Sequence, residues 1–192
     1  NPSADFDKVR DAASYDRLAG AYHKYIEKLS EPLAQRAVAL ARLELGYRVL
    51  DVGTGSGIAS RYAAHKVGPE GSVLGIDLSE GMLKVAAEAS REQAITNIAF
   101  RRMDAERLDF PDESFDAVMS LCAVSHFPNI GTALAQMIRV LRRGRRLVVA
   151  TGHGRPLLGY GLLAYAVKRA VYRLRGFPKP QRWAPHVILD FM

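Results

Sequence analysis

Apolar residues recur along the chain in two patterns, short runs of strand length and longer segments with helical spacing. The short runs are continuous or alternate every second residue, as buried strands do. They are YRVLDV (47–52), SVLGID (72–77), IAFRRM (98–103), FDAVMSL (115–121) and RRLVVAT (145–151). Because helical segments separate them, the order predicts an α/β fold with a doubly wound, mostly parallel sheet and helices on both faces.

Three of the helical segments carry start or stop signals. SEPLAQRAVALARLEL begins at Ser30, a residue type that favours the N-cap, and ends before Gly46, which suits the position after a helix. Ser79 precedes the second segment as another candidate cap. In the third segment, residues 130–143, an apolar stripe runs as far as Leu141. We therefore expect these helices to begin and end at these residues.

A further helical segment precedes the first strand. Its aromatic residues Tyr15, Tyr22 and Tyr25 follow one another at spacings of seven and three, so they can share one face of a helix. Such a face serves either core packing or the covering of a ligand, and both interpretations stay open.

The chain is therefore divided into three parts. Residues 1–46 are expected to form an N-terminal helical arm or lid, and residues 47–151 a ligand-binding core. Residues 152–192 are expected to form a basic helical segment on the side of the substrate. No sixth or seventh strand is obvious in this last part, so we expect a truncated chain whose sheet lacks its last strands.

The charge is distributed unevenly. The formal net charge is +7, and the region from Arg139 to the end holds twelve of the 27 Lys and Arg residues but one of the 20 acids. A basic region can face nucleic acid, an anionic membrane or an acidic substrate, or it can be a solvated surface. If its helix is apolar on one side, peripheral membrane contact is one outcome and plain packing is the other.

Cysteine usage and hydropathy bear on location. Cys122 is the single cysteine and has no partner for an internal disulfide, and no metal-ligand spacing surrounds it. We therefore predict a reducing, cytoplasmic location and no metal. The longest nearly apolar stretch, residues 156–167, is too short to span a bilayer, so neither export nor a transmembrane helix is expected.

A glycine-rich loop follows the first predicted strand, where VLDVGTGSG places Gly53, Gly55 and Gly57 at every second position. In an open parallel sheet, ligands bind beyond the carboxyl ends of the strands, and glycines let the backbone approach them. A dinucleotide site favours G-x-G-x-x-G, but Ile58 occupies the place of its last glycine. An NAD(P)-binding site therefore stays an alternative.

Two acids beside this loop favour a ligand without a diphosphate. Asp51 ends the first strand, where a carboxylate suits an ammonium or sulfonium charge and repels a pyrophosphate. Asp77 follows Gly57 by 20 residues and ends the second strand, where a carboxylate can accept both hydroxyls of a ribose. An adenosyl ligand that carries a positive charge satisfies both acids.

Three stretches in order resemble four motifs of the class I S-adenosylmethionine-dependent methyltransferases, within the ubiquinone/menaquinone C-methyltransferase-like (methyltransferase type 11) group. VLDVGTGSG matches the first motif, GIDLSEGML the second, and RRMDAERLDFPDESFDAVMS the third and fourth. The resemblance covers about Asp11 to Thr151. It implies a Rossmann-like sheet and S-adenosyl-L-methionine as the cofactor.

The resemblance also implies a set of cofactor-binding residues. They are Tyr22, Asp51, Gly53, Thr54, Gly55, Gly57, Asp77, Leu78, Met82, Asp104, Ala105 and Leu121. In this family the glycine loop passes under the methionyl part and the ribose, and Asp51 orients the amino group. The backbone at Leu121 and Cys122 borders the methionine end.

The adenosine part is expected to contact residues of the later motifs. Asp77 binds the ribose hydroxyls, and Leu78 and Met82 pack against the adenine, although Met82 also suits a core position. Asp104 accepts from the adenine amino group, and the backbone N–H of Ala105 binds the ring edge. Asp104 can instead cap a short helix that follows it.

A sulfonium methyl group is already activated, so few catalytic residues are needed beyond those that align the acceptor. If the acceptor is an acidic carbon or a phenol, His126 is the candidate base because it follows the fourth strand near the predicted site. A histidine with a structural role is the alternative, and His153 is a second candidate base. The family's [DNS]-P-P-[YF] motif for amine substrates is absent, since its place reads SLCA.

The expected function is transfer of a methyl group to a small, apolar or lipid-like acceptor at carbon or oxygen. Two alternatives stay open, an NAD(P)-dependent oxidoreductase and a non-catalytic S-adenosylmethionine-binding module. We expect no nucleic-acid partner, and either a monomer or a homodimer.

Overall fold

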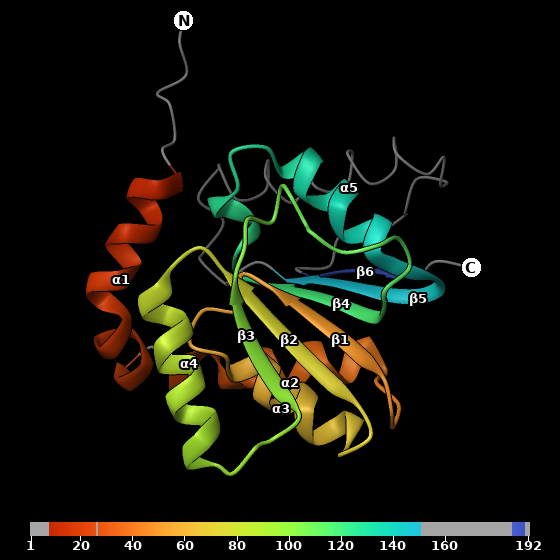
Figure 1. Ribbon diagram of the computed structural model, residues 1–192, viewed down its shortest axis with the longest axis horizontal. Coiled ribbons are helices and arrows are strands. Elements are labelled where there is room, and N and C mark those ends of the chain that lie inside the picture. The colour runs from red at the N-terminus through yellow and green to blue at the C-terminus, as the bar shows by residue number, and fades with distance from the viewer. Residues whose placement is uncertain (1–7, 26, 151–185, 191–192) are drawn as a thin grey trace, which may run out of the picture.

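The computed structural model describes residues 8–25, 27–150 and 186–190, which form one sheet with helices on both faces (Figure 1). The strand order is β3-β2-β1-β4-β5-β6. β1 to β5 pair in parallel, and β6 is antiparallel to β5. The strands are β1 (Arg48–Val52), β2 (Ser72–Asp77), β3 (Ile98–Arg102), β4 (Phe115–Leu121), β5 (Leu141–Ala150) and β6 (His186–Asp190). The predicted doubly wound, mostly parallel fold is confirmed.

Helices cover the two faces of this sheet. They are α1 (Lys8–Tyr25), α2 (Glu27–Ala41), α3 (Ile58–Val67), α4 (Glu80–Glu92) and α5 (Ile130–Val140). α2 and α3 pack on one face around Val49, and α5 packs on the other face around Leu50. Successive residues of a strand point to opposite faces, so β1 contributes to both cores. α1 lies outside this sandwich, against α4 (Figure 1).

The middle of the sheet is buried on both faces. β4 lies between β1 and β5, and its residues from Phe115 to Ser120 are all buried. A strand in this position loses water on both sides, which explains why its sequence is a nearly continuous apolar run instead of an alternating one. All five strands that the apolar pattern predicted are present.

Three predicted helix boundaries are wrong because tertiary contacts override the local signals. α2 begins at Glu27 instead of Ser30, and the carboxylate of Glu27 is bound by side chains of α1 and α3. It also ends at Ala41, well before Gly46. Leu141 does not continue α5 but starts β5, where it is buried and pairs with Phe115.

The predicted cap of α4 is confirmed. Ser79 has extended backbone geometry, and its hydroxyl oxygen accepts from the backbone N–H of Met82 at 3.1 Å. This bond satisfies one of the donors that the first turn of a helix leaves without a partner. It fixes the start of α4 directly after the end of β2.

The last part of the chain contains a strand that the sequence pattern did not reveal. Residues His186–Asp190 pair with β5 from Ala150 to Arg146. A sixth strand is therefore present, and the expectation that this part of the chain supplies none is wrong. A short run with adjacent Val and Ile suits pairing with the exposed edge of β5. The predicted basic helix, with His153, lies in residues 151–185, outside the described residues.

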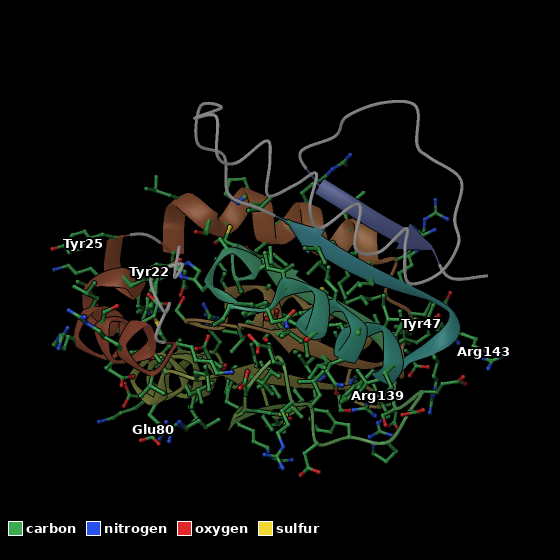
Figure 2. All side chains as sticks on the ribbon, turned by 90° about the horizontal axis from the view of Figure 1, so that it is seen from above. Tyr22, Tyr25, Tyr47, Glu80, Arg139 and Arg143 are labelled. Atoms are coloured by element: carbon green, nitrogen blue, oxygen red, sulfur yellow. The ribbon has the colours of Figure 1, made fainter. Side chains whose placement is uncertain are left out.

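The described basic residues near the start of β5 are engaged in specific contacts. Arg139 donates to the carbonyls of Leu108 and Phe110 at 2.8 and 2.7 Å, and the exposed Arg143 pairs with Glu113 (Figure 2). These residues hold the loop before β4 against the start of β5. None of the helices that the structure describes has the length and apolar character needed to cross a membrane.

Candidate active site

An open cavity of about 800 Å³, its mouth included, lies at the carboxyl ends of β1, β2 and β4. Its floor includes the strand ends Val52, Ile76 and Leu121, and residues of α1 form its opposite wall. The strand order places β2 and β4 on either side of β1, so the direction of winding reverses here. This is the position at which open α/β sheets bind their ligands.

The glycine loop after β1 borders this cavity, and its three glycines have different roles. A Cβ atom on Gly53 would lie 2.2 Å from Cβ of Ala123, so this glycine permits the close approach of the segment after β4. Gly55 lines the cavity with φ +54°, and a Cβ there would point into open space. Gly57 does not line the cavity. A Cβ on Gly57 would lie 2.8 Å from Cβ of Ala86 and 3.1 Å from the ring of Phe100.

Asp77 lies at the end of β2 with both carboxylate oxygens held by backbone donors. Oδ2 accepts from the N–H of Gly55 at 2.9 Å, and Oδ1 accepts from the N–H of Ser79 at 3.0 Å. Burial raises the pKa of this carboxyl, and the two backbone bonds oppose that change. Each oxygen has a further lone pair, so the group can accept two more hydrogen bonds from a ligand in the cavity.

Asp51 is buried under the loop and carries an oxygen without a hydrogen-bond partner among the described residues. Its Oδ2 accepts from the hydroxyls of Thr54 and Ser60 at 2.9 and 2.7 Å, whereas Oδ1 has no such donor. Burial raises the pKa of Asp51 to about 6. With Tyr22 and Thr54 it lines a smaller hollow next to the main cavity. An orphaned buried oxygen is costly, so it marks a place where a cationic donor would be stabilised.

The wall next to β3 is mostly apolar. Leu78, Met82, Met103 and Ala105 line it, and Met82 is also fully in the core. This wall suits the face of an aromatic ring, which is the role that the resemblance implied for Leu78 and Met82. Both the ligand-binding and the core interpretation of Met82 therefore fit its position.

Asp104 stands at the edge of this wall and binds a residue that the sequence did not single out. Its Oδ1 accepts from the N–H of Glu106 at 3.0 Å, which is a capping bond, but the segment that it caps is a turn and not the short helix expected. Its Oδ2 accepts from Nζ of Lys8 at 2.6 Å, and this contact raises the pKa of Lys8. The proposed acceptor for an adenine amino group is thus shared with the first residue of α1.

His126 follows β4 and contacts two side chains of α1 at the cavity. Its Nδ1 lies 3.1 Å from Oδ2 of Asp11, and its Nε2 lies 3.3 Å from the hydroxyl of Tyr15. The Tyr15 ring meets the imidazole edge to face, with centroids 5.3 Å apart. Of the three tyrosines expected on one face, Tyr15 and Tyr22 line the cavity, but Tyr25 is exposed (Figure 2).

α1 is held over the cavity by its contact with α4. Oδ1 of Asp16 accepts from the hydroxyl of Ser79 at 2.6 Å and from the N–H of Gly81 at 2.8 Å. These bonds lower the pKa of Asp16. A Cβ on Gly81 would lie 2.8 Å from Cα of Asp16, so the two helices touch through their backbones.

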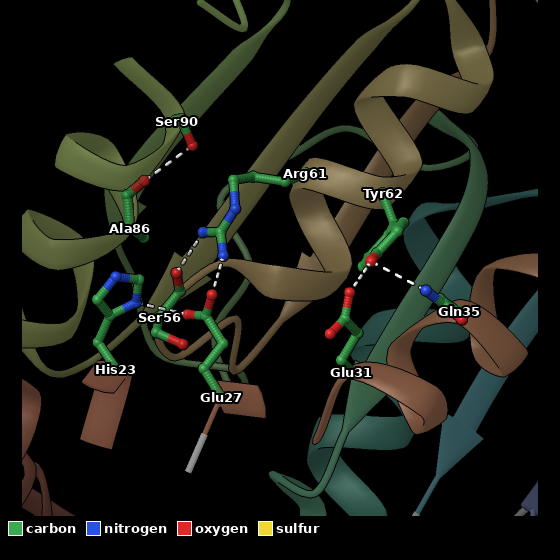
Figure 3. A network of polar contacts seen from close by, with 9 residues as sticks. All are labelled: His23, Glu27, Glu31, Gln35, Ser56, Arg61, Tyr62, Ala86 and Ser90. Atoms are coloured by element: carbon green, nitrogen blue, oxygen red, sulfur yellow. Dashed lines mark hydrogen bonds and ion pairs between the residues drawn. The ribbon is translucent and has the colours of Figure 1, made fainter. Parts of the chain in front are cut away.

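A buried arginine connects the arm to the glycine loop (Figure 3). Arg61 of α3 is 4% exposed, donates to the carbonyl of Ser56 at 2.7 Å, and pairs with Glu27 at the start of α2. The other oxygen of Glu27 contacts Nδ1 of His23 in α1 at 2.7 Å. The chain from His23 to Ser56 therefore links α1, α2 and α3 to the loop that borders the cavity.

The charges around the cavity fit a cationic adenosyl ligand better than a dinucleotide. Asp11, Asp77 and Asp104 line it, against Lys8 and His126. Lys8 is already paired with Asp104, so no free cation remains there for a diphosphate among the described residues. The Rossmann-like fold and this site define a class of proteins that bind a nucleoside cofactor at the carboxyl edge of a parallel sheet.

Comparison with known proteins identifies the family. A family described as "Methyltransferase domain" matches residues 49–144, which include the glycine loop and the three motifs that follow it. The chain belongs to the class I S-adenosylmethionine-dependent methyltransferases, and S-adenosylmethionine is their cofactor. The family sets aside the oxidoreductase alternative.

Curated relatives include enzymes with different acceptors. The chain is 36% identical to aklanonic acid methyltransferase DauC of Streptomyces sp. (strain C5), over 70% of this chain and 61% of that protein. It is 35% identical to ubiquinone/menaquinone biosynthesis C-methyltransferase UbiE of Pseudomonas fluorescens, over 72% and 53%. It is 37% identical to phosphatidylethanolamine N-methyltransferase of Cereibacter sphaeroides, over 83% and 74%.

The chain spans less than two thirds of the length of the first two of these relatives. Among solved structures, a SAM-dependent methyltransferase from Aquifex aeolicus has the same fold, with a TM-score of 0.64. That match covers 77% of this chain and 86% of the other, at 22% identity.

Proposed function

We propose that this chain binds S-adenosylmethionine in the cavity beside the glycine loop and transfers its methyl group to a small, apolar or lipid-like acceptor. The observation that carries the proposal is the carboxylate of Asp77, which the N–H groups of Gly55 and Ser79 hold at the cavity with free lone pairs on both oxygens. A ribose has two adjacent hydroxyls, which match this arrangement.

The remaining cofactor contacts follow from the position of the ribose. The orphaned Oδ1 of Asp51 binds the α-amino group of the methionyl part, directly or through water, because a cation there offsets the cost of burying the carboxylate. Gly53, Thr54, Gly55 and Tyr22 border this part. Gly57 acts indirectly, by letting α3 start close to α4.

On the adenine side, Leu78 and Met82 pack against the ring, and the backbone of Ala105 binds its edge. Asp104 accepts from the amino group in one of two ways. Either Lys8 moves aside, or the carboxylate binds Lys8 with one lone pair and the amino group with another. Leu121 borders the methionine end, where the acceptor approaches.

When bound, S-adenosylmethionine would supply an electrophilic methyl group to the lone pair of the acceptor, and its sulfur would keep the electron pair of the carbon–sulfur bond. The chain's own residues then have to exclude water and align the acceptor. α1 is placed to do so, because it forms the wall of the cavity opposite the strand ends. His126 is the general base.

The acceptor side of the cavity is lined by apolar groups, among them Ala12, Ala123 and Phe127. The names of the relatives refer to a polyketide acid, to quinones and to a phospholipid, which are small or lipid-like molecules. Both observations favour a small acceptor with an apolar body. Transfer to carbon or oxygen is the reaction we propose.

A labelled-methyl assay tests this function. The protein is incubated with methyl-labelled S-adenosylmethionine and a lipid and quinone extract, and Asp77→Ala is the matched control. Label that enters an organic-soluble product with wild type and not with the control supports the proposal. Label in no fraction, despite tight cofactor binding, would favour the non-catalytic binding module instead.

The three-part division of the chain stays a prediction, with residues 1–46 as the arm, 47–151 as the core and 152–192 on the acceptor side. In support of the first boundary, the described helices α1 and α2 precede the sheet. A monomer or homodimer, a cytoplasmic location and membrane contact by the basic segment also stay predictions.

A further inference from the structure

Asp11, Tyr15 and His126 form a cluster at the cavity that cofactor binding does not explain. Two of the three come from α1 and one from the segment after β4, more than 100 positions away in the sequence. All three line the cavity. Each of the two imidazole nitrogens has one hydrogen-bond partner, so the donor and the acceptor of each bond can be assigned.

The partners fix which nitrogen of His126 carries the proton. A carboxylate accepts and does not donate, so Nδ1 must donate its hydrogen to Oδ2 of Asp11 at 3.1 Å. Nε2 is then the nitrogen with a free lone pair, and the Tyr15 hydroxyl donates to it at 3.3 Å. Burial, with the charge of Asp11 next to it, raises the pKa of the Tyr15 phenol, which keeps the phenol protonated as this donor.

We propose that Tyr15, His126 and Asp11 form a proton relay that deprotonates the methyl acceptor, so that this site takes phenols, enols or activated carbon acids in preference to amines. This inference rests on the proposed function. Tyr15 contacts the acceptor and takes its proton, and His126 is the base that takes the proton of Tyr15. Asp11 is a positioning residue that acts through His126.

The relay conserves every proton and electron pair. The O–H or C–H bond of the acceptor breaks, and its proton moves to the oxygen of Tyr15. The phenol's own proton moves to Nε2 of His126, and the resulting imidazolium is stabilised by Asp11 through Nδ1–H. The electron pair left on the acceptor forms the new bond to the methyl carbon. After the product leaves, His126 releases the proton to water.

This chemistry separates acceptor classes. A phenol or an enolisable carbon is a weak nucleophile until it loses a proton, so a base near the methyl group accelerates its reaction. A neutral amine already has a free lone pair and loses its proton after transfer. An imidazole base that a carboxylate holds in one tautomer therefore accelerates transfer to phenols and enolisable carbons more than transfer to amines.

Other ionisable groups also face His126. From α1 these are Asp11 and Tyr15, from the end of β2 Asp77, whose pKa burial raises, and after β4 Cys122. Burial also raises the pKa of Cys122, so the thiol stays neutral at neutral pH. Asp77 adds to the negative potential at His126 but makes no described hydrogen bond to it.

The test is an NMR measurement of the imidazole nitrogen chemical shifts in the full chain without ligand, with His126→Gln used for assignment among the five histidines. We expect wild type to show the tautomer with hydrogen on Nδ1. Asp11→Asn should raise the share of the tautomer with hydrogen on Nε2, because a neutral amide accepts from Nδ1 more weakly than a carboxylate does. Tyr15→Phe should change the chemical shift of Nε2 and leave the hydrogen on Nδ1, because Nε2 loses only its donor.

Matched controls separate these effects from general loosening. Asp109→Asn removes an exposed carboxylate remote from the cavity, and Tyr25→Phe removes an exposed hydroxyl from the same helix as Tyr15. Neither should change the tautomer of His126. A change of tautomer in Asp11→Asn but not in Tyr15→Phe would not arise from a structural disturbance that affects both variants alike.

A hydrogen on Nε2 in wild type, or the same tautomer shares in wild type and Asp11→Asn, overturns the relay and leaves the proposed function intact. Calorimetry of wild type with S-adenosylmethionine tests the proposed function separately, because cofactor binding by wild type does not depend on the relay. Labelled transfer to 1,4-dihydroxynaphthalene exceeding transfer to hexylamine supports the acceptor class. Transfer to the amine alone, or to neither, overturns that class.

Discussion

The two walls of the cavity are built in different ways. The wall on the side of the sheet depends on the backbone, because Gly55 and Ser79 donate their N–H groups to Asp77 and the loop lies close to Ala123. The opposite wall depends on side chains of α1 that bond to residues about 100 positions away. The position of the first wall thus depends on the backbone of the sheet and its loops, and the position of the second depends on how α1 docks. Cofactor binding should therefore tolerate changes in the arm better than acceptor chemistry does.

Removing Arg61, which connects the arm to the glycine loop, should have the largest effect on the free energy of unfolding. Arg61→Met leaves the half-buried Glu27 without its cation and the Ser56 carbonyl without its donor, so we expect a loss of about 3–5 kcal/mol in the free energy of unfolding. Arg101→Met breaks an exposed pair with Asp109 and should cost less than about 1 kcal/mol. Urea denaturation of both variants measures the difference, and equal losses would show that the buried network does not join the two regions.

Gly53→Ala tests the wall on the side of the sheet. The new Cβ would lie 2.2 Å from Cβ of Ala123 at a backbone φ of +71°, so we expect a loss of about 2–4 kcal/mol and weaker cofactor binding. Gly46→Ala is the matched control, since its φ is +81° but nothing lies within 4 Å of its Cβ. It should cost about 1 kcal/mol. Thermal denaturation that ranks the two variants the other way would contradict the close approach.

The buried carboxyl of Asp51 should make stability depend on pH. Burial raises its pKa from 3.8 to about 6, so the folded state binds this proton more tightly than the unfolded state does. Its contribution is complete below pH 3.8 and is lost as the pH rises through about 6. Between those values, wild type should lose up to about 3 kcal/mol relative to Asp51→Asn. Parallel stability curves for the two proteins would show that the carboxyl is not buried as described.

Asp77→Ala should weaken the binding of S-adenosylmethionine by about 1–3 kcal/mol, because two hydrogen bonds to the ribose are lost. The fold should persist, since the side chain lies at the end of β2 and outside the two apolar clusters. Calorimetry gives the affinity and circular dichroism checks the fold. An unchanged affinity in a folded variant would mean that Asp77 does not hold the ribose.

The smallest effect is expected at the other end of the arm. Lys8→Met frees Oδ2 of Asp104, so the affinity for S-adenosylmethionine should rise by up to about threefold, or less than about 1 kcal/mol. Asp104→Asn, measured beside it, should lower the affinity. A drop of tenfold or more in Lys8→Met would place Lys8 among the cofactor contacts and contradict the separation of the two walls.

The sheet and the loop on its edge were predictable because their signals are short-range. The five apolar runs became strands, and the spacing from Gly57 to Asp77 followed from one helix between two strands. β6 was missed because five residues gain strand geometry from the edge of β5 and not from their own pattern. The predicted start of α2 at Ser30 was wrong because Arg61 binds Glu27, and no local sequence pattern indicates that contact.

The arm shows the opposite case. Tyr15 and Tyr22 were placed on one face by their spacing, but nothing in the sequence paired Tyr15 with His126 or Lys8 with Asp104. Those pairs depend on the docking of Asp16 at the start of α4. Sequence reasoning therefore found the base candidate and missed the residues that orient it.

The central claim is that the cavity binds an adenosyl cofactor without a diphosphate, with its ribose on Asp77. Calorimetric titration of wild type with S-adenosylmethionine, its demethylated product and NADH tests this claim most directly. Our account predicts binding of the first two, weakened in Asp77→Ala, and no binding of NADH. Binding of NADH alone, or equal binding of all three ligands by wild type and Asp77→Ala, would contradict it.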